Sequence, residues 1–124
     1  MAEISQADFR EYARALGTVV EFDPGHALFH EGEAPRFVYF VLKGSVDISI
    51  RGRGIESIEE GQAVGLLSFV DHQPRSVTAT TKSACELALI DQKKFRYMVE
   101  SLPGFVWFVL GELGIRLRKA NAAL

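Results

Sequence analysis

The sequence predicts a small, mainly β domain, either a sandwich or a barrel, with helices at both ends. Turn-forming residues recur about every ten residues through the middle of the chain, as in small all-β folds. Between these turns apolar residues alternate with polar ones, and the last part of the chain changes to helical spacing. A length of 124 residues suits one domain, and a hydrophobic content of 48% suffices for a core.

A short helix is expected first. Its apolar face is formed by Phe9, Tyr12, Ala13 and Leu16. Ser5 and Asp8 resemble a helix start, and Gly17 is a typical helix end. The period then changes to two, so the β region begins at Thr18.

The strands follow in order along the chain. Val46, Ile48 and Ile50 alternate with polar residues and give the clearest half-buried strand. The segment Arg51–Gly54 is the expected hairpin turn, with two glycines available for positive φ. The full set of expected strands covers residues 19–22, 28–30, 36–43, 46–50, 55–58, 76–81 and 84–90.

Two helices are expected after the last strand. Asp91 can cap the first helix, and the segment Leu102–Gly104 interrupts it before a longer helix starts near Phe105. One stripe has heptad-like spacing and comprises Val99, Leu102, Val106, Leu110, Leu113, Leu117, Ala120 and Leu124. This stripe either packs on the domain's own barrel or forms the seam of a two-helix dimer.

A second apolar face on the last helix favours the dimer. It consists of Phe105, Trp107, Phe108, Val109 and Ile115. One face can then cover the barrel while the other meets a partner, so we expect a homodimer through the C-terminal helix.

Composition and cysteine content exclude several classes of protein. A net charge of −2 argues against broad electrostatic binding to nucleic acid. Cys85 is the single cysteine, which excludes an intrachain disulfide framework and a cysteine-rich zinc site. His26, His30 and His72 are not spaced as metal ligands, so no metal is expected. The first residues lack the basic and apolar regions of a secretory signal.

No membrane span and no enzyme active site are expected either. The longest apolar stretch, near residues 105–110, is far shorter than a membrane-spanning helix. The chain has no set of nucleophile, base and carboxylate with the spacing of a catalytic mechanism. The acidic residues Glu31, Glu33, Glu59 and Glu60 fit turns and rims. We therefore expect a cytoplasmic, non-enzymatic protein without a cofactor.

One segment carries a possible anion site. Gly65 precedes the short apolar run 66–69, which suits a helix start, and the N-terminus of a helix offers free N–H groups to an anion. Arg75 follows ten residues later with the bidentate geometry that suits phosphate, and Ser76 adds a hydroxyl. A lone arginine at a strand start is more often a surface ion pair, so these residues alone leave both interpretations open.

Several motifs, in order, resemble the cyclic nucleotide-binding domain family of the catabolite activator protein and the protein kinase A regulatory subunits. The resemblance covers about Leu16 to Leu124. It is carried by the segments Pro24–Glu33, Phe37–Val46, Pro74–Ala79 and Ala84–Ile90, by Gly61 and Gly65, and by Lys94 and Phe95. The segment Pro74–Ala79 matches the end of the family's phosphate-binding cassette.

The resemblance implies a double-stranded β-helix (jelly-roll) barrel over about residues 18–90, with C-terminal helices over about 91–124, in a single domain 1–124. It implies cAMP or cGMP as ligand, with Arg75 on the cyclic phosphate and Ser76 on a phosphate oxygen. The backbone of Gly65, Leu66 and Leu67 would supply N–H groups, and Asn121 would cap the base.

One position departs from the family pattern. The family has a glutamate after the cassette glycine, which accepts a hydrogen bond from the ribose 2′-hydroxyl, and this chain has Leu66. Ser68 is a poorly placed substitute. Three outcomes follow: cyclic nucleotide binding with altered affinity or preference, binding of another anion through Arg75, or a ligand-independent interaction module.

The resemblance also bears on partners. A transcription regulator of the catabolite activator type needs a helix-turn-helix after the long helix, and the chain stops at Leu124. We therefore expect no DNA-binding module in this sequence and a separate effector protein. The leading hypothesis is a stand-alone cyclic nucleotide sensor, and the alternative is a dimerisation module of the same fold.

Overall fold

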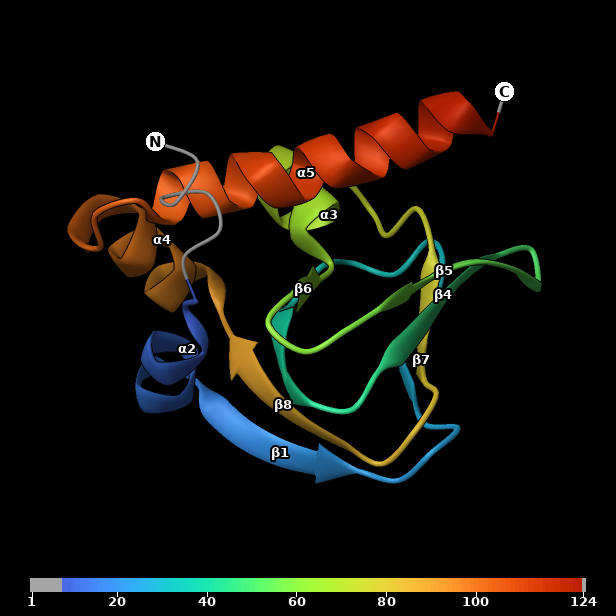
Figure 1. Cartoon of the computed structure of the whole chain (residues 1–124), viewed down its shortest axis with the longest axis horizontal. Helices are drawn as coiled ribbons and strands as arrows, with labels where there is room; N and C mark the ends of the chain where they lie inside the picture. The colour runs from blue at the N-terminus through green and yellow to red at the C-terminus, as the bar shows by residue number, and fades with distance from the viewer. Residues whose placement is uncertain (1–7, 124) are drawn as a thin grey trace.

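The computed structural model describes residues 8–123 and confirms a mainly β domain with helices at both ends (Figure 1). The helices are α2 (Arg10–Leu16), α3 (Leu66–Asp71), α4 (Gln92–Ser101) and α5 (Phe105–Ala122). The strands are β1 (Thr18–Phe22), β2 (Ala27–Phe29), β3 (Val38–Lys43), β4 (Val46–Ile50), β5 (Arg53–Ile58), β6 (Ala63–Val64), β7 (Thr78–Thr81) and β8 (Cys85–Ile90).

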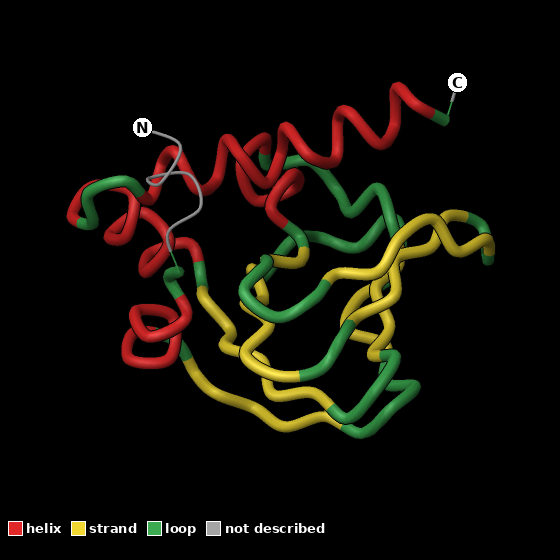
Figure 2. Tube along the Cα trace, in the orientation of Figure 1, coloured by secondary structure: helices red, strands yellow, loops and turns green. Residues whose placement is uncertain are grey.

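The strands form two antiparallel four-stranded sheets. Their orders are β1-β8-β3-β6 and β2-β7-β4-β5, so strands distant in sequence are neighbours in each sheet. This arrangement agrees with the expected jelly-roll architecture. Strand β6 lies at the edge of its sheet, where Ala63 pairs with Phe40 and Val64 with Tyr39. Figure 2 shows the strands gathered below α5, which crosses one end of the barrel.

Most of the expected elements are present, with three corrections. Strand β6 was not predicted, because two residues give no periodic signal. Gly54 lies within β5, so the hairpin turn uses Arg51 and Gly52, which have φ values of 51° and 79°. The first helix begins at Arg10, later than expected. Asp8 still accepts the Arg10 N–H, whereas Ser5 lies outside the described residues.

The apolar side chains form two clusters. The barrel cluster fills the space between the sheets and consists of Phe29, Tyr39, Val41, Val46, Ile48, Ile58, Val64, Ala79, Cys85 and Leu87. The helix-side cluster consists of Phe9, Ala13, Val38, Phe40, Leu42, Ala63, Leu66, Phe69, Ala88, Ile90, Phe95, Met98, Phe105, Phe108 and Val109. Because neighbouring residues of β3 point to opposite faces, this strand contributes to both clusters.

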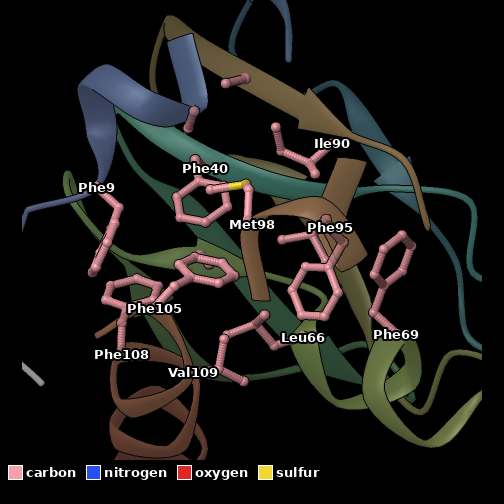
Figure 3. Close-up of a cluster of buried hydrophobic side chains, with 14 of the residues drawn as sticks. Phe9, Phe40, Leu66, Phe69, Ile90, Phe95, Met98, Phe105, Phe108 and Val109 are labelled. Carbon is pink, nitrogen blue, oxygen red and sulfur yellow. The ribbon is translucent and has the colours of Figure 1, made fainter. Parts of the chain in front are cut away.

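Aromatic rings dominate the helix-side cluster (Figure 3). Phe105 is fully buried, and its ring meets those of Phe9 and Phe95 edge-on at 5.2 and 5.7 Å between centroids. Phe40 and Phe108 stack at 5.7 Å. These contacts join α2, α4 and α5 to β3, so the helices are part of the core.

The first C-terminal helix is capped as expected. The Asp91 carboxylate accepts the Lys94 N–H at 2.8 Å, and the break at Leu102–Gly104 separates α4 from α5. Within residues 8–123 no single helix is long and apolar enough to cross a membrane. Helices α4 and α5 reach that length and composition only as a pair, bent by 114°.

Helix α5 has a buried face and an exposed apolar face. Phe105, Phe108, Val109 and Glu112 are buried. The predicted second apolar face is divided, because Trp107 and Ile115 are exposed, by 59% and 40%. The heptad stripe is divided: Leu102 and Leu113 pack partly against the core, whereas Val106, Leu110 and Leu117 are exposed.

Candidate functional site

The backbone of Arg75 is fixed on both sides by the turn at residues 32–33. Its N–H donates to the Glu33 carbonyl and its own carbonyl accepts the Gly32 N–H, both at 2.8 Å. These bonds join two loops that are about forty residues apart in the sequence. The backbone from which the Arg75 side chain extends is therefore held by two hydrogen bonds.

The Arg75 side chain is only 4% exposed. Its Nη1 donates to the Gly65 carbonyl at 2.8 Å, and its Nη2 donates to the Phe37 carbonyl. The guanidinium carbon lies 3.9 Å from the centroid of the Phe29 ring, which is a cation–π contact. Of the two interpretations that the residues alone left open, the surface ion pair is thus excluded for this arginine.

The buried charge of Arg75 has no carboxylate partner among residues 8–123. Its Nε is buried and makes no hydrogen bond. Burial lowers the pKa of the guanidinium, and the more distant Tyr39 and Glu33 act in the opposite direction. A buried cation without a counter-ion is costly, so the site is complementary to an anion.

Gly65 brings the start of α3 against Arg75. Its φ is 88°, a left-handed conformation, and a Cβ here would overlap Nη1 of Arg75. Glycine is therefore required on both conformational and steric grounds. Leu66 and Leu67 are the first two residues of α3, at the end of the helix that adjoins the guanidinium. Their N–H groups have no acceptor within the helix, because the first N–H groups of any helix lack one.

Leu66 does not line the side of the site occupied by Arg75. Its side chain is 5% exposed and belongs to the helix-side cluster, among α4 and α5 residues such as Phe95 and Val109 (Figure 3). Leu67 is 53% exposed. Ser68 is buried and donates to the Pro74 carbonyl at 3.2 Å, which agrees with its expected poor placement as a ribose acceptor.

The other two expected site residues are exposed. Ser76 directly follows Arg75, ahead of β7. Asn121 lies in the last turn of α5, next to the segment that Lys119 ties to Glu56 of β5. Within the described part of the chain, no hydrogen bond joins either residue to Arg75. Their contacts with a ligand stay predictions.

Several residues of the site were not foreseen from the sequence. Phe29 and Phe37 contact Arg75 through a ring and a carbonyl, and neither contact has a sequence signature. Glu112 is buried on α5 and accepts the Ala63 N–H at 3.0 Å. Its position did carry a signal, since residues 105, 108, 109 and 112 form one helical face, and a glutamate on such a face requires a partner.

A separate groove of about 380 Å³ lies on the helical side of the molecule, away from Arg75. Helices α3, α4 and α5 form it, with Val70, Phe95, Val99, Val106 and Leu110 among its lining residues. Within residues 8–123, no cluster of three or more His, Cys, Asp or Glu side chains could hold a metal ion.

Comparison with known families identifies the domain. The family model described as the cyclic nucleotide-binding domain matches residues 19–101. The chain belongs to this family. Its members include regulatory domains, and the matched range includes all the barrel strands from β2 to β8, helix α3 and Arg75.

Sequence relatives include a transcriptional regulator and a guanine nucleotide exchange factor. The chain is 34% identical over 97 residues to the cAMP-activated global transcriptional regulator CRP of Salmonella typhimurium, an alignment that covers 73% of this chain and 46% of the regulator. It is 30% identical over 95 residues to Rap guanine nucleotide exchange factor 3 of Rattus norvegicus, covering 72% of this chain and 10% of that protein. The chain thus spans less than half the length of these relatives.

Solved structures share the fold. The catabolite activator protein of Thermus thermophilus superposes with a TM-score of 0.79 at 21% identity, covering 94% of this chain and 57% of that one. A structure titled "Sp-2Cl-cAMPS bound to PKAR CBD2" superposes with a TM-score of 0.70 at 20% identity, covering 90% and 84%. Both likenesses support the jelly-roll architecture.

Proposed function

We propose that residues 1–124 form one cytoplasmic sensor domain that binds a cyclic nucleotide, cAMP or cGMP. The observation that carries this proposal is the buried Arg75 guanidinium, which has a bare Nε and no carboxylate partner within residues 8–123. A cyclic phosphodiester carries one negative charge and two free oxygens, which suit the planar donor edge of arginine.

Each expected residue has a role in this proposal. Arg75 neutralises the phosphate, and the N–H groups of Leu66 and Leu67, beside Gly65, donate to its oxygens. Ser76 donates a further hydrogen bond, and the Asn121 amide bonds to the base. Ligand binding then shifts the helices from Asp91 to Leu124, to the extent that the ligand prefers one helix arrangement over the other.

Calorimetric titration tests the proposal. Purified protein is titrated with cAMP, cGMP and cyclic di-GMP, the last because one similar fold is titled as a c-di-GMP responsive regulator. We expect saturable binding of cAMP or cGMP and its loss in Arg75→Ala. Arg53→Ala, which removes an exposed arginine on β5, is the matched control and keeps the wild-type affinity. Nucleotide binding that survives Arg75→Ala unaltered contradicts the assignment.

The presence of Leu66 leads to a prediction about recognition of the ribose 2′-hydroxyl. Since the Leu66 side chain is apolar and packs into the helix-side cluster, and Ser68 is only 5% exposed, neither supplies an acceptor for a ribose 2′-hydroxyl. We expect cAMP and 2′-deoxy-cAMP to bind with dissociation constants within about threefold, because a lost hydrogen bond would cost more than that. A preference of tenfold or more for cAMP would reveal a ribose acceptor elsewhere.

The second candidate function is a ligand-independent dimerisation module, with a separate effector protein as its partner. Two observations favour it. Leu66 stands where the family has the ribose-binding glutamate, and α5 has an exposed apolar face with Val106, Leu110 and Leu117. In both proposals this face forms a homodimer. The double variant Leu110→Glu, Leu117→Glu should then convert a dimer to a monomer in light scattering. A dimer that persists in this variant contradicts the proposed seam.

A further inference from the structure

Glu112 is the one acidic residue on the buried face of α5 in the described part of the chain. Its side chain is 7% exposed, and the other buried residues of the helix are Phe105, Phe108 and Val109. A carboxylate in such surroundings loses hydration and is retained only with a hydrogen-bond partner. The partner identifies what the residue does.

That partner is the edge of the barrel. Glu112 Oε1 accepts the Ala63 N–H at 3.0 Å, across 49 residues of sequence. Ala63 is the first residue of β6, an edge strand of two residues that pairs only with β3. Glu112 therefore takes the place of a neighbouring strand for this amide, so one side of β6 is fixed by β3 and the other by α5.

Strand β6 leads directly to the anion site. Val64 is followed by Gly65, whose carbonyl accepts a hydrogen bond from Nη1 of Arg75 at 2.8 Å. Only Val64 lies between Ala63, whose amide is held by α5, and Gly65, whose carbonyl orients the guanidinium. A shift of β6 thus moves the acceptor of Arg75. The residues before the strand cannot absorb the displacement, because Gly61 and Gln62 are themselves hydrogen-bonded to Val41 of β3.

The charges around Glu112 stabilise its position on the barrel. Arg116 lies with Nη1 3.7 Å from the Glu112 carboxylate and with Nε 3.8 Å from that of Glu56 on β5. Lys119 pairs with the same Glu56 at 3.2 Å. Burial is the main effect on the Glu112 carboxyl and raises its pKa, Glu56 adds to the rise, and the Ala63 hydrogen bond, Arg116 and Lys119 oppose it.

We propose that Glu112 is a positioning residue of the ligand site: it holds β6 in place, and through β6 it holds the Gly65 carbonyl against Arg75. The inference deepens the proposed function, on which its ligand arm rests. It places the connection between helix α5 and the anion site in one hydrogen bond.

The test compares Glu112→Ala with Glu112→Gln. Glutamine keeps the acceptor oxygen and removes the charge, so it should rescue the positioning role, whereas alanine removes the acceptor. Glu100→Ala, which removes an exposed glutamate from α4, is the matched control. Amide exchange at Ala63 and the nitrogen-15 signal of Arg75 Nε are recorded without ligand, and cAMP is then titrated.

For Glu112→Ala we expect about tenfold faster exchange at Ala63, a shifted Arg75 Nε signal and about tenfold weaker cAMP binding. Glu112→Gln and Glu100→Ala should stay within twofold of wild type. An unchanged Arg75 Nε signal in folded Glu112→Ala overturns the inference, as does unchanged cAMP affinity. If the wild-type protein binds cGMP instead of cAMP, the same variants are titrated with cGMP. If it binds neither nucleotide, the proposed function fails, and the Arg75 signal alone decides the role of Glu112.

Discussion

The barrel cluster and the helix-side cluster are both apolar, but they differ in how they are built. The barrel cluster is filled by strand residues, mostly aliphatic, and Arg75 lies against it through Phe29. The helix-side cluster is filled by phenylalanines from α3, α4, α5 and β3 and by Phe9, which precedes α2, and Leu66 belongs to it. Gly65 and Leu66 are adjacent in sequence but contribute to different sides. The segment from β6 to α3 is therefore a boundary, with the buried Arg75 guanidinium on one side and helix packing on the other.

The largest expected effect breaks the helix-side cluster. Phe105→Ala removes a fully buried ring that contacts those of Phe9, Phe40, Phe95 and Phe108. We expect the free energy of unfolding to fall by about 3–5 kcal/mol, measured by urea denaturation. Trp107→Ala, two residues along the same helix but exposed, should change it by less than about 0.5 kcal/mol. Equal effects of the two variants would contradict the assignment of faces.

A smaller effect is expected at the boundary itself. Gly65→Ala forces a side chain into a left-handed conformation with φ of 88° and into the space of Arg75. The strain costs about 1–2 kcal/mol, and displacement of the guanidinium should abolish nucleotide binding. Denaturation and calorimetry measure the two effects separately. Gly52→Ala, at a left-handed turn position with open space around it, should show the strain without the loss of binding.

The barrel cluster should respond less to a conservative change. Ile58→Val removes one methyl group from a side chain that is 2% exposed. We expect a loss of about 0.5–1.5 kcal/mol in the free energy of unfolding, with nucleotide affinity unchanged because Arg75 keeps its contacts. The same denaturation and titration experiments check both values. A large loss of affinity would show that the two clusters are coupled through the barrel rather than through α5.

The smallest effect concerns the polar contact within the helix-side interface. Since burial raises the pKa of Glu112, the folded protein binds its proton more tightly than the unfolded chain does. The stabilisation from this proton is complete below the unfolded pKa and is lost as the pH rises through the folded value. Between pH 4 and pH 7, the melting temperature of wild type should therefore fall relative to that of Glu112→Gln. A parallel course of the two melting curves would contradict this.

Local patterns explain why some features could be predicted and others not. The strand at residues 46–50 and the Asp91 cap rest on neighbouring residues, so periodicity and side-chain chemistry sufficed. The contact of Arg75 with the Gly65 carbonyl depends on a turn of the backbone between them and on the Phe29 ring. Such contacts join distant segments and leave no periodic trace. The resemblance to a family supplied the expected pairing of Arg75 with the cyclic phosphate. The packing of the Leu66 side chain into the helix-side cluster could be seen only in the structure.

The position of Trp107 has a spectroscopic consequence. It is the only tryptophan of the chain, and its side chain is 59% exposed on α5. The indole emission of the protein therefore arises from a single site on this helix. An α5 partner, whether a second copy or an effector, that covers this ring should shift the emission to shorter wavelength. The unlabelled protein thus contains its own fluorescent probe of what docks on this helix.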